Sequence, residues 1–499
     1  MKPFKGISAR AVAGFACQQG FINSLFYIGD NRAVSIGGMS LERFDLLSTF
    51  AFMAVAFIIA LIASDRARRA LLAPTLVGWY AVLLVLGSLL VTLPMDAGIT
   101  EIVSEGALVG LSTGFLLCTW GRALVGAPRF AGAREILLAT ALGAAASFAA
   151  SALPIPGAVE VLKLLPIGSA WALRSLLSKQ NNDSLPSSNT AEITGTESEA
   201  DAITLSSLLA SPQERSATKR LSIKIVAGTA LFGLAGGLME VFSSEPGMLS
   251  TPALPATLMI VVLFCVAAAQ VLAAEADGES GSSRAENSFS GVYRTSVLLI
   301  MAGYLFVPVL GGFGITGQAI VLAGYLGLTC VLMMLFATIA RASGQDAACV
   351  FARGLFALFI GEIAGILLGN VLEVAQPSAT QPYVVAACAG LASLFAYLFL
   401  FTERDYEELT SIAGGIDLFG RACETITQKY GLSKREAEVL PLALRGRTSE
   451  RIASELYIAK STADTHLRRI YSKAGVHGRQ ELIDLGERLQ HDLSHGDRG

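Results

Sequence analysis

Positively charged side chains gather in one short stretch near the C-terminal end of the sequence. Residues 460–479 contain five cationic residues and one anionic residue, Asp464, whereas residues 402–499 as a whole carry 15 basic and 16 acidic residues. Lys and Arg side chains neutralise phosphates, and Arg also reads base edges in the major groove of DNA. Charge concentrated on one element is typical of a nucleic-acid contact, although a solvated helix face is the alternative interpretation.

Short helices position this stretch. The sequence predicts four of them, over residues 433–445, 449–457, 461–474 and 479–489. Ser433, with Glu436 three residues later, forms a capping box that starts the first helix, and Ser461 is the expected N-cap of the third. Two short helices joined by a tight turn, the second with a cationic outer face, form a helix-turn-helix.

The third of these helices has distinct inner and outer faces. Ala463, Ile470 and Ala474 recur at helical spacing and are expected to face inward, together with either Leu467 or His466. The outward side chains are then Asp464, Thr465, Arg468, Arg469, Ser472 and Lys473.

The segment "LSKREAEVL…LRGRTSERIASELYIAKSTADTHLRRIYSKAGVHGRQELI" resembles the LuxR-type DNA-binding domain over about 60 residues. The matching positions are Leu432, Arg435, Glu436, Glu438, Val439, Leu440, Gly446, Ile452, Ala453, Leu456, Ser461, Thr462, His466, Ile470, Lys473, Gly475, Val476 and Arg479. The resemblance implies that the fourth helix forms a dimer seam. It also implies base reading by Asp464, Thr465 and Arg468, and phosphate contacts from Lys460, Thr462, Arg469 and Lys473.

Two departures from the family pattern follow the Ser-Thr pair. The usual branched residue and cation are replaced by Ala463 and Asp464. The Asp464 carboxylate could accept a hydrogen bond from cytosine N4, or it could simply occupy the first turn of the helix, where the dipole favours an anion. Ala474, where the family usually has Leu, gives a smaller core residue.

The rest of the chain has a different composition. Of 499 residues 53% are hydrophobic and only 15% charged, and the mean hydropathy is +0.58, which is typical of a membrane protein. Apolar segments long enough to cross a bilayer as helices are predicted at 9–29, 44–64, 71–93, 102–122, 135–153, 157–177, 222–243, 253–274, 295–313, 316–340, 354–375 and 381–401. No cleavable signal peptide is expected.

The fold class is therefore all-α, a twelve-helix transmembrane bundle followed by a small four-helix domain. The expected parts are a membrane sensor domain 1–401 (first six helices 1–177, polar disordered cytoplasmic linker 178–220, second six helices 221–401), a connector 402–427 and a helix-turn-helix domain 428–493. With both ends inside, the internal segments hold 19 Lys and Arg and the external ones 2. This bias predicts a multi-pass protein of the bacterial cytoplasmic membrane with both termini cytoplasmic.

The six-plus-six arrangement resembles the major facilitator superfamily. The loop "ASDRARRALL" at 63–72 is similar to that family's Asp-Arg…Arg-Arg loop, although Ala67 replaces its Gly and the equivalent loop of the second half lacks the motif. Anchoring by positive charge is the alternative interpretation of this loop. Polar groups within spans are function candidates, so Asn23, Glu105, Glu240 and Glu362 are predicted to line a ligand pocket, unless they bond between helices.

The seven Cys are scattered and form no CxxC pair, so no disulfide framework or zinc site is expected. The sequence shows no Ser-His-Asp set, metal cluster or Walker loop, so no cofactor or enzymatic activity is expected. The two resemblances together imply a membrane-embedded one-component transcriptional regulator. In it the membrane domain senses a small molecule or a membrane condition and controls the helix-turn-helix. The implied partners are promoter DNA carrying an inverted repeat, an unknown ligand, membrane lipid and a second copy of the chain. The alternative is a facilitator-type transporter with a regulatory or degenerate helix-turn-helix tail.

Overall fold

The computed structural model describes residues 7–27, 32–36, 39–90, 98–126, 129–151, 153, 155–183, 211–242, 253–276, 282–310, 317–375 and 381–496. Its elements are α1 (Ala9–Tyr27), β1 (Val34–Ile36), β2 (Met39–Leu41), α2 (Phe44–Ile62), α3 (Asp65–Leu71), α4 (Pro74–Leu90), α5 (Ile99–Val125), α6 (Arg129–Ser151), α7 (Ile155–Asp183), α9 (Pro212–Phe242), α10 (Leu254–Ala276), α11 (Ser282–Leu310), α12 (Gly317–Ser343), α13 (Ala347–Ala375), α14 (Gln381–Phe395), the π-helix η2 (Ala396–Leu400), α15 (Glu403–Lys429), α16 (Lys434–Leu444), α17 (Ser449–Leu456), α18 (Lys460–Ala474) and α19 (Arg479–Gly496).

The predicted helical bundle is confirmed, and each of the twelve expected segments contains a helix. Among the described residues, seven helices are long and apolar enough to cross a membrane, or up to nine if each of two bent helix pairs is one span. The protein is therefore a multi-pass membrane protein, but the number of twelve spans is not fully confirmed. A short antiparallel hairpin, β1–β2, is an addition to the all-α expectation.

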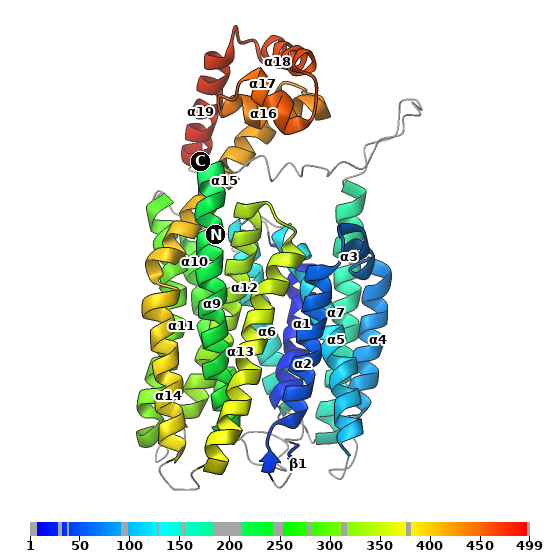
Figure 1. The fold of residues 1–499 in the computed structure, drawn as a ribbon, viewed down its shortest axis with the longest axis vertical. Helices are drawn as coiled ribbons and strands as arrows, with labels where there is room; N and C mark the ends of the chain where they lie inside the picture. The colour runs from blue at the N-terminus through cyan, green and yellow to red at the C-terminus, as the bar shows by residue number, and fades with distance from the viewer. Residues whose placement is uncertain are drawn as a thin grey trace.

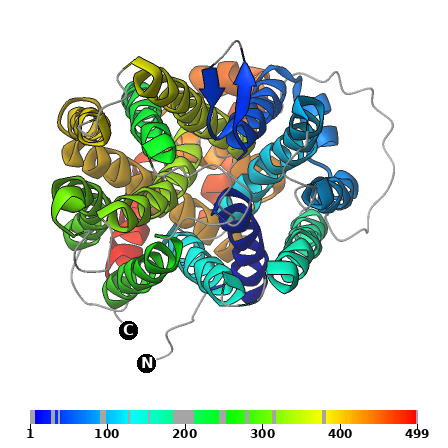
Figure 2. The ribbon, with the colours of Figure 1, turned by 90° about the horizontal axis from the view of Figure 1, so that it is seen from below.

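Two groups of helices make up the bundle. Figure 2 shows α1–α7 on one side and α9–α14 on the other. The groups meet where α13 packs on α2 and α5, and where α6 packs on α10. Small residues allow close approach within the second group, because a Cβ at Gly233 or Gly361 would meet the backbone oxygen of the facing helix. The side of the bundle with α3 and α15 is called the connector face below, and the side with β1–β2 the hairpin face (Figure 1).

The polar segment between the two groups is partly helical. α7 continues to Asp183 and α9 begins at Pro212, so both ends of the predicted disordered linker 178–220 are helices, and that part of the prediction is wrong. Ser211 and Glu214 explain the early start of α9, since the Ser211 hydroxyl accepts from the Glu214 amide and the Glu214 carboxylate accepts from the Ser211 amide. The remainder of the linker, 184–210, lies outside the described residues.

The connector is one continuous helix, α15. Thr402 and Asp405 form a capping box that starts it, after a bend of 49° from the end of the last span. The N-terminal part of α15, through Ile416, packs in the hydrophobic core of the bundle. The C-terminal part, from Phe419, packs in a second core that also contains α16–α19. At about 1.5 Å per residue, α15 is about 40 Å long, and it joins the two cores without an intervening loop (Figure 1).

Candidate nucleic-acid interface

The helix-turn-helix forms where the sequence predicts it, with one correction. Ser433 and Glu436 make the predicted capping box of α16. Helix α18 begins at Lys460 after Ala459, so Ser461 lies in its first turn and the prediction that it is the N-cap is wrong. The turn before α18 passes through Tyr457, whose φ of 53° lies in the left-handed region. The N-cap of α18 therefore lies two residues earlier than the Ser-based rule expects.

Helix α18 has the inner and outer faces expected from its spacing. Ala463, Leu467, Ile470 and Ala474 are all buried in the domain core. Leu467, and not His466, is therefore the inward residue of the second turn, where the sequence left both open. The opposite face carries Thr465, Arg468, Arg469, Ser472 and Lys473, all exposed, beside a half-buried Asp464.

The candidate base-reading residues share this outer face. Arg468 and Arg469 have no ion pair with any side chain that the structure describes, so their guanidinium groups are available to a partner. The Thr465 hydroxyl donates to the Ser461 carbonyl at 2.8 Å. Figure 1 shows α18 at the end of the molecule opposite β1, so the membrane bundle does not cover this helix.

Asp464 does not lie at the helix terminus. Because α18 begins at Lys460, Asp464 is the fifth helical residue and lies beyond the first turn, where the dipole effect has fallen off. Asp464 interacts electrostatically with Lys460, one turn earlier, whose ammonium group donates to the Glu450 carboxylate at 2.6 Å. Glu450 raises the pKa of Lys460, and Asp464 adds to that effect. The interpretation of Asp464 as a helix-terminus anion therefore loses its basis.

Lys473 has partners inside its own domain. Its ammonium group donates to the Glu436 carboxylate at 2.7 Å and to the Gly431 carbonyl at 3.0 Å. Burial would raise the pKa of Glu436, but hydrogen bonds from Lys473 and from the Ser433 amide outweigh that effect and lower it. We therefore assign Lys473 to the stability of the domain, in place of the phosphate contact expected from the resemblance.

The apolar face of α19 is already covered within the same chain. Leu482 is fully buried, and Leu485 and Leu489 pack on the core to which Cys423 and Ile426 of α15 also contribute. A dimer seam on α19, as the resemblance implies, would have to use other residues of this helix or displace α15.

Comparison with known proteins identifies this domain. Residues 431–485 match the family model described as "Bacterial regulatory proteins, luxR family". Residues 431–485 form a LuxR-type helix-turn-helix domain. The chain is similar to the HTH-type transcriptional regulator MalT of Yersinia pestis (strain Pestoides F), with 43% identity over 58 residues. It is also similar to the regulator of the same name from Serratia proteamaculans (strain 568), with 38% identity over 65 residues. These matches cover 12% and 13% of this chain and only 6% and 7% of the relatives.

The chain is also similar to solved transporter structures. One is the Major Facilitator Superfamily transporter FucP in the outward conformation, at 14% identity with a TM-score of 0.43, covering 78% of this chain and 97% of FucP. Another is a bacterial homologue of the iron transporter ferroportin in its outward-facing state with soaked iron, at 11% identity with a TM-score of 0.45, covering 81% and 98%. Both TM-scores lie below 0.5.

Two of the predicted ligand residues in the membrane domain are ion-paired. Glu105 of α5 pairs with Arg32 at 3.2 Å, and Glu240 of α9 pairs with Arg43 at 3.4 Å. Both arginines lie in the segment that contains the β1–β2 hairpin, and all four side chains are largely buried. This arrangement favours the alternative that these carboxylates hold helices together.

Of the other two predicted ligand residues, Glu362 lies close enough to Glu240 of the second pair for their like charges to interact. Asn23 is buried on α1 and Glu362 is half-buried on α13. Another polar residue of α13 has a clear structural role, because the Asn370 amide accepts from the Glu42 amide at 2.7 Å and donates to the Glu42 carbonyl at 3.3 Å. Together with the Arg43–Glu240 pair, this contact joins the two helix groups at the hairpin face.

A matching contact at the connector face involves an aspartate that the sequence analysis did not select. Asp346, in the turn between α12 and α13, accepts from Arg68 Nε at 2.9 Å and from Arg122 Nη2 at 2.5 Å. Arg68 also donates to the Ala63 carbonyl at the end of α2. Burial would raise the pKa of Asp346, but the hydrogen bonds from Arg122 and Arg68 lower it to about 2. Arg68 of the "DRARR" loop thus belongs to an ion-pair cluster with Arg122 and Asp346 that joins the two helix groups. This cluster is called the clasp of the connector face.

Proposed function

We propose that the chain is a membrane-embedded one-component transcriptional regulator. The observation that carries the proposal is α15, a continuous helix whose N-terminal part belongs to the core of the membrane bundle and whose C-terminal part belongs to the core of the LuxR-type domain. A movement of the bundle that displaces the start of α15 must therefore displace the DNA-binding domain. The proposed signal is a small molecule or a membrane condition, and the proposed output is a change in promoter binding.

Ion pairs fix the first two turns of α15 to the bundle. Lys224 of α9 pairs with Asp405 at 2.8 Å, and Arg294 of α11 pairs with Glu403 at 3.3 Å. The Tyr293 hydroxyl donates to the last carbonyl of the span, that of Phe401, at 2.7 Å. The Tyr293 ring stacks on the ring of Tyr406, with the planes 8° apart. Two helices of the second group therefore hold the connector directly.

A second link joins the bundle and the LuxR-type domain. Glu214, at the start of α9, pairs with Arg445 at the end of α16 at 3.4 Å. The Arg445 guanidinium also lies over the ring of Phe419 of α15, 4.8 Å from its centroid. Helix α9 thus contacts both the connector and the first helix of the DNA-binding domain. A rotation of α9 would shift both contacts together.

On DNA, we propose that Asp464, Thr465 and Arg468 read base edges, while Lys460, Thr462 and Arg469 contact phosphates. Two copies on an inverted repeat would double these contacts, because half-sites one helical turn apart present the same groove face. The excess of Lys and Arg on the connector-face side supports a cytoplasmic location of both termini in the bacterial cytoplasmic membrane. No catalytic step forms part of the proposal.

The test uses the full chain in lipid nanodiscs, selected against a random DNA pool at two salt concentrations. Recovery of an inverted-repeat motif by the wild type, and its loss with Arg468→Ala, is the expected result. Arg488→Ala, which removes an exposed cation of α19 instead, is the matched control and should keep the motif. Selection of no motif by a folded wild-type chain would overturn the proposal.

A transporter with a regulatory tail is the second candidate. The observation in its favour is that ion pairs join the two helix groups at both faces, Arg43–Glu240 at the hairpin face and Arg68–Asp346 at the connector face. In a transport cycle these two contacts would have to open in turn. This reading expects substrate flux through the reconstituted chain and no change in that flux with Arg468→Ala. A motif recovered from the DNA pool counts against it as the sole function.

A further inference from the structure

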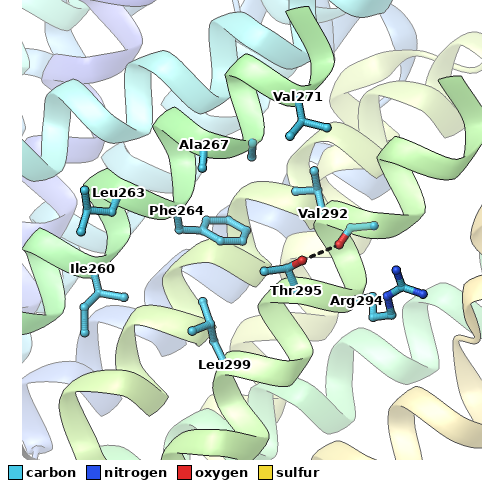
Figure 3. Close-up of a pocket in the computed structure, with 11 residues that line it drawn as sticks. Ile260, Leu263, Phe264, Ala267, Val271, Val292, Arg294, Thr295 and Leu299 are labelled. Atoms are coloured by element: carbon cyan, nitrogen blue, oxygen red, sulfur yellow. Dashed lines mark hydrogen bonds between the residues drawn. The ribbon is translucent and has the colours of Figure 1, made fainter. Parts of the chain in front are cut away.

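A lateral groove between α10 and α11 opens on the outside of the bundle. Its cavity volume is about 510 Å³, within the range of small-molecule sites. The lining is apolar over most of its length and includes Phe264, Leu263 and Leu299. Figure 3 shows the Phe264 ring pointing from α10 toward Val292 and Thr295 of α11. Leu263 keeps 63% of its surface exposed, so the groove faces the lipid side of the helices.

The polar end of the groove lies toward the connector. The Thr295 hydroxyl already donates to the Gly291 carbonyl at 2.7 Å, which leaves the Arg294 guanidinium as the charged group of the lining. Arg294 is 55% exposed and pairs with Glu403 in the first turn of α15. The groove therefore has an apolar body and a cationic mouth at the connector face.

We infer that this groove is a binding site for an anionic phospholipid, with one acyl chain along Phe264 and Leu299 and the phosphate on Arg294. Lipid tails are as apolar as the groove, so burial of the chain discriminates little between lipids. Selectivity must then come from the head group, and Arg binds phosphate through two parallel hydrogen bonds. Basic pockets between membrane helices bind anionic head groups for this reason.

The lipid phosphate and Glu403 would compete for the same guanidinium. Both partners of the Arg294–Glu403 pair are partly exposed, and an ion pair of this kind is weak enough to be exchanged. Tyr293, the neighbouring residue on α11, holds the end of the last span through the Phe401 carbonyl. Lipid binding in the groove and the position of the start of α15 are thus coupled through one turn of α11. Each must affect the other by the same free energy.

The consequence for DNA binding rests on the proposed function, whereas the lipid site itself does not. Native mass spectrometry of the full chain tests the site, with phosphatidylglycerol and phosphatidylcholine of identical acyl chains as the probes. The wild type should bind one phosphatidylglycerol about tenfold more tightly than phosphatidylcholine. Arg294→Gln should abolish this preference, and Ala267→Trp, at an exposed position of the lining, should weaken both lipids by filling the groove.

Arg220→Gln is the matched control. Arg220 is another exposed arginine that also pairs with α15, through Glu408 at 2.9 Å, but it does not line the groove. It should keep the preference, and Glu403→Gln should tighten phosphatidylglycerol binding about threefold by removing the competitor. Equal affinity of the wild type for the two lipids would overturn the site, and so would the same loss with Arg220→Gln. Displacement of phosphatidylglycerol by equimolar oleate would overturn the assignment to a phospholipid.

DNA binding in nanodiscs with and without phosphatidylglycerol separates the two proposals. A change in promoter affinity that Arg294→Gln removes supports both. Specific lipid binding with unchanged promoter affinity would leave the lipid site standing and would contradict its coupling to DNA binding.

Discussion

The membrane domain and the LuxR-type domain use charged residues in opposite ways. In the bundle, Arg43 is 4% exposed and pairs with Glu240 across the two helix groups. On α18, Arg468 and Arg469 are exposed and have no ion pair among the described residues of their domain. A charge that is buried with its partner holds the fold together, because leaving either partner alone in the interior is costly. A charge left in water is available for an external phosphate or base.

The same contrast exists within the DNA-binding domain. Lys473 looks like a phosphate contact from its position, yet its ammonium group reaches the nearly buried Glu436. Arg469, one turn earlier, makes no such contact. Burial of the partner, and not the charge of the residue itself, separates the structural cation from the cation that is available to DNA.

The largest effect is expected at the clasp of the connector face. Asp346→Ala leaves Arg68 and Arg122 facing each other without their shared carboxylate. Loss of a partly buried pair of this kind should lower the free energy of unfolding by about 3 kcal/mol. Denaturant unfolding in mixed micelles measures it. Arg69→Ala, an exposed neighbour on α3, is the control and should stay within about 0.5 kcal/mol of the wild type.

The pH dependence of stability sharpens this prediction. The pKa of Asp346 is lowered to about 2 from its ordinary 3.8, which corresponds to about 2 kcal/mol of stabilisation by the ionised carboxylate. This contribution is fully present above the ordinary pKa and is lost as the pH falls from about 4 toward 2. The difference between wild type and Asp346→Asn should therefore shrink over that interval. A difference that stays constant with pH would show that the carboxylate does not act through its charge.

The next effect is expected on DNA. Arg468→Ala should weaken promoter binding by about 2 kcal/mol, roughly thirtyfold, and relax the preference at one base pair. Arg469→Ala should weaken all sequences alike and reduce the salt slope by about one. Binding to a set of single-base variants of the selected motif at two salt concentrations distinguishes the two. Identical behaviour of both variants would mean that the reading face of α18 is misassigned.

A smaller effect tests the structural role of Lys473. Lys473→Met keeps the aliphatic stem but removes the two hydrogen bonds to Glu436 and Gly431. It should destabilise the LuxR-type domain by about 1–2 kcal/mol, because a nearly buried carboxylate loses its partner. Since Glu436 keeps its lowered pKa through Lys473, the loss should diminish in acid. The salt slope of DNA binding should stay unchanged, and a reduction by one would restore Lys473 to the phosphate contacts.

The local pattern predicted the helices well because each signal acts over a few residues. The Ser433–Glu436 box and the spacing of Ala463 and Ile470 need no tertiary information, and both are found as expected. The N-cap at Ser461 failed because the turn through Tyr457 fixes where α18 begins. A cap rule based on residue type does not contain that constraint.

Pairing across the bundle was beyond the sequence for a physical reason. Glu105 and Glu240 are acidic residues within apolar spans, which is the pattern expected of ligand residues. Only the positions of Arg32 and Arg43 in the fold show that the two carboxylates are already ion-paired. Asp346 lies in an unremarkable turn, and its two partners are separated from it by 278 and 224 residues. Contacts of that range depend on how the helix groups meet, which no local period encodes.

The smallest change tests the coupling between the two regions. Gly415 lies in the middle of α15, between Ala413 and Ile416 of the membrane core and Phe419 of the DNA-binding core. A Cβ at Gly415 would meet nothing within 4 Å, so Gly415→Ala fits without strain. Removing a helix-interior glycine should stabilise the helix by about 1 kcal/mol and stiffen the junction. If α15 transmits the state of the bundle, the response of promoter affinity to phosphatidylglycerol in nanodiscs should increase.

Gly415→Pro is the opposite change, since it removes a backbone donor and breaks the helix at the same residue. It should leave the affinity of the DNA-binding domain for the promoter intact and abolish the dependence on the bundle. A chain that responds equally with Ala, Gly and Pro at this position would mean that the link between Glu214 and Arg445, and not α15, connects the two regions.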